Sequence, residues 1–364
     1  MAILRLRRAL VEAGVISAVV AVPARPSLPS MVARPSRPAE LAGYDAVLGV
    51  DGAGREMAAH AGLPFIELVK ALYAGVLPNE NVLVRALLVR SLVIEMTGAR
   101  EADAVVAPSH FAAASVIREY GADPAVVHVV PEPFDVDEWR GSLPPRARDG
   151  TRVLCVAHLY PRKRVLDLLA AWPLVRAMRP DARLDIVGNG PELRALERRA
   201  RYLDGCYLHG FVPPEAAPQF YARADSFCLP SAQETFGYAA VEAMASGLPV
   251  VGADAGAMPE VTSGATARLV PPGSPRELAG AVLWSLEPDV RAEAAHRNPE
   301  RTRDFDPAFV ATALLRIVNA AAADAQRRDS GSSALRSGEA RNSSIAARTL
   351  SLLAARESAK KPPS

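Results

Sequence analysis

Short apolar runs alternate with stretches of helical periodicity along almost the whole chain. Near the start, Leu4, Leu6, Ala9 and Leu10 recur at the spacing of one helix face, and residues 15–22 then form an apolar run typical of a buried strand. Such alternation is the pattern of α/β domains built on parallel sheets. The opening segment therefore predicts a helix followed by the first strand of an α/β domain.

The same opening segment has a second interpretation. Arg5, Arg7 and Arg8 precede the apolar run and Pro23 follows it, which superficially resembles a signal or transit peptide. We favour the helix and strand because Gly14 can end the helix. Whether the first 30 residues act as a targeting peptide stays open from the sequence.

The rest of the first half continues the alternation. The hydroxyl of Ser109 can cap the helix that begins there. The predicted strands are residues 44–52, 64–70, 103–108 and 125–130, and the helices lie at 56–62, at 81–97 and from Ser109 onward.

Residues 141–151, GSLPPRARDGT, combine prolines, glycines and charges, which indicates a linker between domains 1–147 and 151–304. A second and more regular α/β unit follows the linker. From residue 327 the composition shifts to Ser, Arg, Ala and Gly, so we expect 327–364 to be a tail that is disordered or only partly helical. The second unit is predicted to have strands at 151–159, 182–190, 206–212, 225–231, 248–254 and 265–272, and helices at 164–178, 191–203 and 236–246.

Composition narrows the class of protein. A chain of 364 residues exceeds one ordinary core, and 42 basic against 40 acidic residues leave a net charge of +2, too small a field to favour nucleic acid as a partner. Cys155, Cys206 and Cys228 form neither a zinc motif nor a disulfide framework, which favours a reducing, cytoplasmic compartment. No apolar run approaches the ~20 residues that cross a bilayer. We therefore expect two soluble domains without a transmembrane segment.

The strongest candidate site is ETFGYAAVEAMASGLPVV, residues 234–251. If Gly237 lies at the helix start, the backbone N–H groups near Phe236 and Gly237 form an anion-binding end for phosphate. Glu242 could then accept hydrogen bonds from a diol such as ribose, and Glu234 would face what projects beyond the phosphates. Taken alone, the two glutamates are more typical of a helix cap and a solvated helix face.

Two upstream segments support a phosphate site. Gly188 and Gly190 directly follow a predicted strand, where glycine permits a tight turn and close approach of a ligand. Arg162, Lys163 and Arg164 lie where an earlier strand ends and a helix begins, and cations there would neutralise a diphosphate. A structural turn and a solvated basic loop are the alternatives.

Residues 156–172, 185–196 and 207–282 resemble, motif by motif, the C-terminal domain of family-4 retaining glycosyltransferases. The resemblance covers about 151–287. Weaker similarity at 101–121 and 129–139 matches the end of that family's N-terminal domain. It implies the GT-B fold, an α/β architecture of two Rossmann-like domains that face a cleft, with a last helix, 305–326, crossing back to the first domain.

The resemblance also implies roles for individual residues. Glu242 would hold the donor ribose, Glu234 would contact the transferred sugar, and Lys163 would hold the diphosphate, with Arg162 beside it. We take Glu260, in the MPE segment, as structural. The other groups implied around the donor are the backbone near Phe236 and Gly237, Gly190 in the cleft, and Gly210 to Val212 near the base.

The chain departs from the family at two places. His158 stands where the family usually has arginine, so one phosphate cation is expected to be weaker and pH-dependent, and Arg162 or Arg164 could compensate. The family's opening strand and glycine-rich loop are not recognisable, so we expect a truncated N-terminal domain with exposed apolar sheet edges.

Three further residues are weak candidates for the cleft. Asp51 ends a strand where the family places acceptor-side groups, and an ordinary turn residue is an equal interpretation. His60 and His110 are more often structural or surface histidines.

The resemblance implies transfer of a hexose from a nucleoside diphosphate sugar to a hydroxyl acceptor with retention of configuration. No metal or other cofactor is expected, because the cations and the helix start would neutralise the diphosphate. A nucleotide-sugar-binding protein that has lost catalysis is the main alternative, and a GT-B epimerase is a weaker one. The base, the sugar and the acceptor are not indicated.

Overall fold

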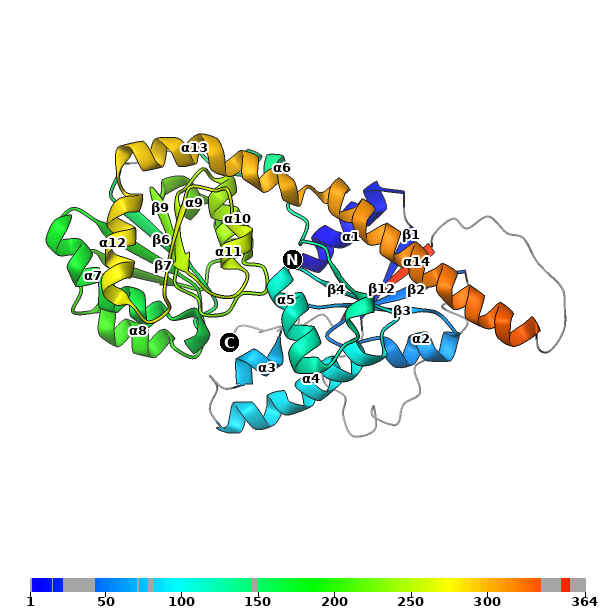
Figure 1. Cartoon of the computed structure of the whole chain (residues 1–364). Coiled ribbons are helices and arrows are strands. Elements are labelled where there is room, and N and C mark those ends of the chain that lie inside the picture. Colours follow the sequence, from blue (N-terminus) through cyan, green and yellow to red (C-terminus); the bar gives the residue numbers. More distant parts are fainter. Residues whose placement is uncertain are drawn as a thin grey trace, which may run out of the picture.

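A computed structural model describes residues 2–14, 16–21, 43–70, 72–77, 82–145, 149–334 and 348–353. Two α/β lobes lie side by side, and a long helical run passes from one to the other (Figure 1). Each lobe is built on a six-stranded sheet in which all paired strands are parallel. The carboxyl ends of parallel strands share one edge, so the loops that follow them gather together.

The N-terminal sheet has the strand order β1-β12-β2-β3-β4-β5. Successive residues of β2 point to opposite faces of the sheet, as the pleat requires: Leu48 lies in one hydrophobic cluster with Leu314, and Val47 lies in another with Ala112. The strands are β1 Ile16–Ala21, β2 Ala46–Val50, β3 Phe65–Leu68, β4 Ala104–Ala107, β5 Val127–Val129 and β12 Arg348–Leu353. The helices of this lobe are α1 Ala2–Glu12, α2 Arg55–Ala61, α3 Tyr73–Val76, α4 Val82–Glu101, α5 His110–Ser115, the π-helical continuation Val116–Tyr120 and α14 Pro307–Ala334.

The tail expected to be disordered or only partly helical supplies part of this sheet. Helix α14 continues to Ala334, and Arg348–Leu353 forms β12, which pairs with β1 on one side and β2 on the other. The helix to Ala334 agrees with the partly helical alternative for 327–364, whereas a strand at Arg348–Leu353 was not predicted, because composition does not show that RTLSLL can fill a gap between two strands. An unfilled gap would leave two unpaired strand edges, and β12 covers both. Residues 335–347 and 354–364 lie outside the described residues.

The C-terminal sheet has the strand order β11-β10-β9-β6-β7-β8. Its central strand β9 is buried along its whole length, as expected for a parallel sheet covered on both faces. The strands are β6 Arg152–Val156, β7 Arg183–Val187, β8 Cys206–Gly210, β9 Ser226–Leu229, β10 Val250–Ala253 and β11 Ala267–Val270. The helices that pack on this lobe are α6 Val136–Gly141, α7 Val165–Met178, α8 Leu193–Ala200, α9 Pro218–Arg223, α10 Tyr238–Ala245, α11 Met258–Val261, α12 Pro275–Ser285 and α13 Pro288–Thr302.

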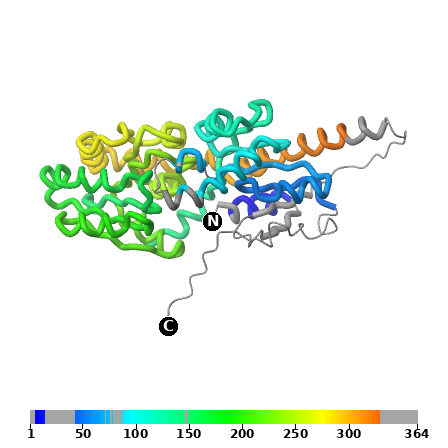
Figure 2. Tube along the Cα trace, turned by 90° about the horizontal axis from the view of Figure 1, so that it is seen from below, coloured from blue at the N-terminus to red at the C-terminus, as the bar shows by residue number. Residues whose placement is uncertain are grey.

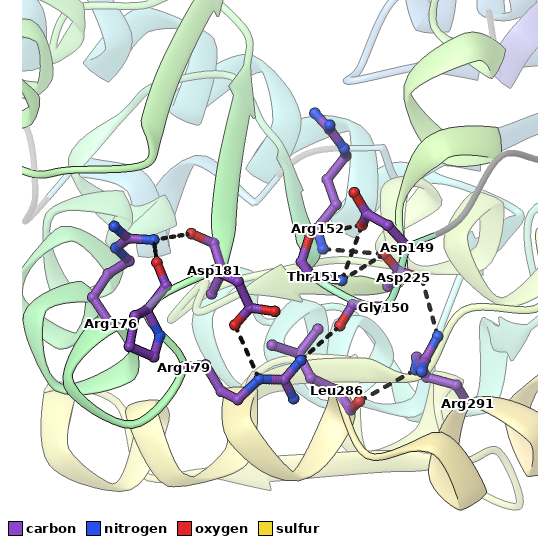
Figure 3. Close-up of polar contacts among 12 residues, drawn as sticks. Asp149, Gly150, Thr151, Arg152, Arg176, Arg179, Asp181, Asp225, Leu286 and Arg291 are labelled. Atoms are coloured by element: carbon purple, nitrogen blue, oxygen red, sulfur yellow. Dashed lines mark hydrogen bonds and ion pairs between the residues drawn. The ribbon is translucent and has the colours of Figure 1, made fainter.

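A buried carboxylate joins the amino ends of β6 and β9 (Figure 3). Asp225 is fully buried and accepts hydrogen bonds from the backbone N–H groups of Thr151, at 3.0 Å, and Arg152, at 3.1 Å. Arg291 of α13 adds an ion pair at 3.2 Å. Charge-assisted bonds to a buried carboxylate are among the stronger ones in proteins, so this network anchors the end of the linker to the sheet.

Helix α14 lies across the N-terminal lobe, against α1 and the sheet (Figures 1 and 2). Val310, Leu314 and Val318 are buried there, whereas Phe309 is exposed. The helical stretch Pro288–Arg328 is long and apolar enough to cross a membrane by length and composition. It was not predicted from the sequence, because polar residues interrupt its apolar positions. The core helix of a globular lobe passes the same test, and 33% of the most apolar window is buried.

Candidate functional site

The loops after β6 and β9 bring Lys163 and Glu234 together. Strands β6 and β9 are neighbours in the sheet, so the loops at their carboxyl ends meet, and the N–H of Ala232 donates to the carbonyl of Arg162 at 2.8 Å. The Lys163 ammonium lies 2.5 Å from a Glu234 carboxylate oxygen, with side chains only 13% and 10% exposed. The two residues predicted to be catalytic therefore form one buried ion pair.

Helix α10 begins directly after the Glu234 loop. Gly237 precedes its first residue with φ of +98°, in the left-handed region that glycine adopts without strain. The prediction that the helix starts at Gly237 is thus confirmed, and its first N–H groups supply the positive end of the helix dipole. Phe236 is 3% exposed, and its ring packs edge-on against Tyr238 and Phe305. The side chain of Phe236 is therefore not available to a ligand.

Glu242 lies in the second turn of α10 and already has two partners. The Tyr221 hydroxyl donates to one of its oxygens at 2.9 Å, and Arg5 of α1 lies 3.6 Å from the other. The Arg5 guanidinium stands 5.1 Å from the ring centroids of both Phe134 and Tyr238. Burial raises the pKa of Glu242, whereas Arg5 and the Tyr221 hydroxyl lower it. A cation from the first helix thus reaches the predicted ribose carboxylate.

The other two cations of the basic segment have partners of their own. The Arg162 guanidinium lies 4.9 Å from the centroid of the Tyr160 ring. Arg164 has φ of 53° and forms an ion pair with Asp167 at 2.6 Å, inside the first turn of α7. Lys163 is therefore the cation of this segment that pairs with Glu234.

His158 lies on the same loop, before the basic segment. Desolvation by the surrounding loop, together with the charges of Lys163 and Arg162, lowers the pKa of His158. A histidine with a lowered pKa is neutral at pH 7. His158 can therefore donate one hydrogen bond to a phosphate, but it does not replace an arginine charge.

Backbone packing explains the glycines of the GNG turn. At Gly188, with φ of +145°, a Cβ would lie 1.8 Å from the Ala157 carbonyl oxygen, and at Gly190 it would lie 2.6 Å from that of Leu159. Close backbone packing is therefore enough to explain why both positions are glycine, without a ligand. The N–H of Gly188 also donates to the Gly210 carbonyl at 2.8 Å, so this turn adjoins the Gly210 to Val212 segment predicted near the base.

The N-terminal lobe contributes residues that the sequence interpretation missed. The Lys70 ammonium, after β3, lies 2.5 Å from a Glu132 oxygen, and the other Glu132 oxygen accepts from the Tyr238 hydroxyl at 3.2 Å. The Thr235 hydroxyl donates to the Lys70 carbonyl at 3.1 Å. A second cation thus lies beside the start of α10. The available signal was the position of Lys70 as the last residue of the predicted strand 64–70.

The side chains of the two histidine candidates, His60 and His110, form no hydrogen bond with the described site residues around α10. His60 is exposed on α2, and its ring bonds to the Glu56 carbonyl at 2.7 Å. His110 is exposed at the start of α5 and contacts the other lobe through its backbone N–H. The interpretation of both as surface residues agrees with these contacts.

Asp51 adjoins a buried acidic cluster in the N-terminal lobe. It has φ of 52° in the turn after β2, where the N–H of Gly52 donates to Glu67 at 2.8 Å. Glu95 of α4, also fully buried, accepts from the Tyr73 N–H at 3.1 Å and from the Tyr120 hydroxyl. Burial, and then the nearby Asp51 charge, raise the pKa of Glu95 to about 8, and burial also raises the pKa of Glu67.

Glu95→Gln is expected to make the chain less sensitive to alkaline pH. Because the folded pKa of Glu95 is raised from 4.5 to about 8, its stabilising contribution is complete below pH 4.5 and is lost as the pH rises through 8. Each pKa unit is worth about 1.4 kcal/mol, so the rise from 4.5 to about 8 corresponds to about 4–5 kcal/mol by pH 8, and the amide should add free energy of unfolding of that order there. Urea unfolding at pH 5, 6.5 and 8 measures this.

The matched control for Glu95 is Glu101→Gln, at the end of the same helix, where the side chain is 55% exposed. Its pH dependence should follow that of the unmodified protein. If Glu95→Gln and Glu101→Gln show the same dependence on pH, Glu95 is not protonated in the folded chain.

Nothing in the described part of the chain points to a bound metal. No group of three or more His, Cys, Asp or Glu side chains in the described ranges is placed to hold a metal ion. The site within these ranges is built from ammonium, guanidinium and carboxylate groups together with a helix start.

Comparison with known proteins places this arrangement in a family. Residues 150–287 match the family described as glycosyl transferases group 1. The chain is 33% identical over 215 residues to a D-inositol 3-phosphate glycosyltransferase of Acidothermus cellulolyticus, which covers 53% of this chain and 47% of that protein. It is 30% identical over 214 residues to a GDP-mannose-dependent alpha-(1-6)-phosphatidylinositol monomannoside mannosyltransferase of Mycolicibacterium smegmatis, covering 54% and 56%. The chain spans about half the length of the curated relatives it matches.

Solved structures with the same fold extend over both lobes. HepE of Anabaena, in complex with UDP-glucose, aligns with a TM-score of 0.61 at 21% identity over 75% of this chain and 78% of that one. TarM of S. aureus aligns with a TM-score of 0.63 at 16% identity over 78% and 57%. These alignments confirm the predicted GT-B fold of two Rossmann-like domains. Residues 150–287 therefore match the glycosyl transferases group 1 family, the family-4 glycosyltransferases of the GT-B fold, and the likeness to that family holds for this part of the chain.

Proposed function

We propose that this chain is a retaining glycosyltransferase that moves a hexose from a nucleoside diphosphate sugar to a hydroxyl acceptor. The observation that carries the proposal is the buried pair of Lys163 and Glu234 at the start of α10. A cation, a carboxylate and the positive end of a helix meet there. This combination suits a ligand with a diphosphate at one end and a sugar at the other.

The proposed roles of the site residues follow from their charges. Lys163 and the first N–H groups of α10 stabilise the negative charge that develops on the departing diphosphate. Glu234 is then released from Lys163 to position the sugar hydroxyls. Glu242 accepts hydrogen bonds from the ribose diol in place of its contact with Arg5. Placement and electrostatics supply the rate gain, and no covalent nucleophile is required.

The donor class draws support from the relatives. One is named as GDP-mannose-dependent, and the Anabaena structure holds UDP-glucose. Both donors are nucleoside diphosphate sugars that differ in the base and in the hexose. For this chain we therefore propose the class of donor and leave the choice of base to measurement.

Thermal unfolding with UDP, GDP and ADP tests the donor site. One nucleotide, at a hundred times its dissociation constant, should add about 2.7 kcal/mol and raise the midpoint by several degrees. Glu242→Ala should remove most of this shift. Glu242→Gln, which keeps an acceptor for Tyr221, should retain part of it because one amide oxygen can still accept from ribose.

The same titration has outcomes that count against the proposal. If the shift in unfolding midpoint is undiminished in Glu242→Ala, Glu242 does not bind the ribose. The absence of a shift with any of the three nucleotides, in a folded protein, would reject the donor site. A shift without turnover of the matching donor sugar would reduce the function to nucleotide-sugar binding.

A further inference from the structure

A carboxylate of one lobe meets the first turn of a helix in the other lobe, beside the donor site. Glu260, in α11 of the C-terminal lobe, accepts from the backbone N–H of His110 at 2.8 Å with one oxygen, and from that of Phe111 at 3.0 Å with the other. These are the first two N–H groups of α5, and such groups have no partner within their own helix. A negative charge at this end of a helix is also favourable.

The loop that carries Glu234 docks on the same part of the N-terminal lobe. The Ser109 hydroxyl, directly before α5, donates to the Thr235 carbonyl at 2.7 Å. Gln233 and Thr235, on either side of Glu234, donate from their side chains to backbone carbonyls after β3. These carbonyls belong to Leu72, at 3.4 Å, and Lys70, at 3.1 Å.

Glu260 is connected to Glu234 through a short, tightly packed backbone. The N–H of Ala257 donates to the Glu234 carbonyl at 3.0 Å. Gly256, with φ of +61°, lies so close that a Cβ there would be 2.7 Å from the Glu234 nitrogen. A shift of α11 relative to the N-terminal lobe would therefore move the segment that holds Glu234.

We propose that Glu260 is a positioning residue, whose contact with α5 holds the two lobes closed and sets Glu234 against the N-terminal lobe. This role rests on the proposed transferase function and deepens it. From the sequence we took Glu260 as structural, and its partners prove to lie in the other lobe. Charge-assisted hydrogen bonds to both oxygens favour the closed arrangement, and opening returns all three groups to water.

Glu260→Gln tests this role with little change of shape. The amide keeps one acceptor oxygen but turns an NH₂ group toward an N–H donor, so one of the two contacts is lost. Nucleotide affinity, measured by calorimetry, should stay within about twofold of the unmodified protein, since the donor contacts lie on the C-terminal lobe. The kcat for donor turnover should fall about tenfold or more, because the reacting groups are misplaced. Small-angle scattering should show a larger radius of gyration.

Glu277→Gln is the matched control, because Glu277 is exposed in the first turn of α12 in the same lobe. It should change neither kcat nor the radius of gyration. An unchanged kcat in Glu260→Gln overturns the positioning role, even if the lobes open. If Glu260→Gln lowers the unfolding midpoint, Ser109→Ala, which breaks the neighbouring contact, should reproduce the loss of kcat with unchanged nucleotide affinity.

Failure of the proposed function would look different. No turnover with any donor, in a protein that binds nucleotide, would reject the transferase but leave the closure measurable. The amides of His110 and Phe111 should then still exchange hydrogen faster in Glu260→Gln than in Glu277→Gln. Equal exchange rates in the two variants would reject the contact itself.

Discussion

Lys163→Met is expected to lower the turnover of the donor sugar by about 10²–10³-fold, the effect of removing one well-placed stabilising group from a water-poor site. Methionine keeps the length of the side chain and removes its charge. The ammonium lies 2.5 Å from Glu234, and both side chains are nearly buried, so solvent cannot replace it. The charge that develops on the departing diphosphate would then be met only by the start of α10.

Arg179→Met is the matched control for Lys163. It removes one positive charge from the same lobe, at the opposite end of the sheet, where Arg179 pairs with Asp181 (Figure 3). Turnover should stay within about twofold there, because exposed ion pairs contribute little. Similar losses in both variants would mean that net charge matters rather than the position of Lys163.

Glu234 allows the coupling within the pair to be measured. If Lys163 and Glu234 act on one bound sugar diphosphate, Lys163→Met and Glu234→Gln together should cost less than the sum of their separate effects. Glu234→Gln should lower kcat more than nucleotide affinity. Additive effects of the two substitutions would show that Lys163 and Glu234 act independently of each other.

The candidate site was predictable where it depends on local pattern. Gly237 marks a helix start because it adopts a left-handed backbone conformation that other residues adopt only with strain. Ser109 caps α5, as predicted, and its hydroxyl oxygen accepts a hydrogen bond from the N–H of Ala112 at 3.0 Å. The family resemblance assigned Lys163 and Glu234 to one donor, and the structure brings them together because each lies in a loop after one of two neighbouring strands, β6 and β9. The parts of the site that could be predicted from the sequence thus lie mainly in the loops between a strand and the following helix.

Contacts between distant segments were not predictable in this way. Arg5 reaches Glu242 across more than two hundred positions, and neither residue type signals the other. Glu132 and Glu260 stand in segments that were quoted for their resemblance, yet their partners belong to other elements. Only tertiary packing defines these pairs, within the N-terminal lobe for Lys70 and Glu132 and between the lobes for Arg5 and Glu260.

The first sheet shows the same limit for a whole strand. Alternation of apolar residues predicted β1 to β5, but RTLSLL lies in a segment whose composition favours disorder. What makes it a strand is the place between β1 and β2, where both of its edges find partners. The residues around position 350 give no indication that the N-terminal sheet has an open position between β1 and β2.

Leu350→Pro is therefore expected to destabilise the N-terminal lobe, on the order of 3 kcal/mol or more. Leu350 pairs with Ala18 of β1 and with Val47 of β2, so it lies in the interior of the sheet. Proline removes the backbone N–H of residue 350, which faces one of these neighbours, and its ring keeps the neighbouring strand away. The carbonyl left without a donor adds a cost of about 1–3 kcal/mol.

Hydrogen exchange followed by mass spectrometry measures this effect lobe by lobe. In Leu350→Pro, peptides from β2 and β3 should lose protection, while those from β6 and β9 keep it, because the second sheet has no contact with β12 in its strand order. Leu350→Val is the control, since valine keeps the N–H and favours strands. Unchanged protection of β2 in the proline variant would show that β12 does not occupy the interior of the sheet. Loss of protection in both sheets would show instead that the lobes unfold as one unit, with α14 and the Glu260 contact joining them.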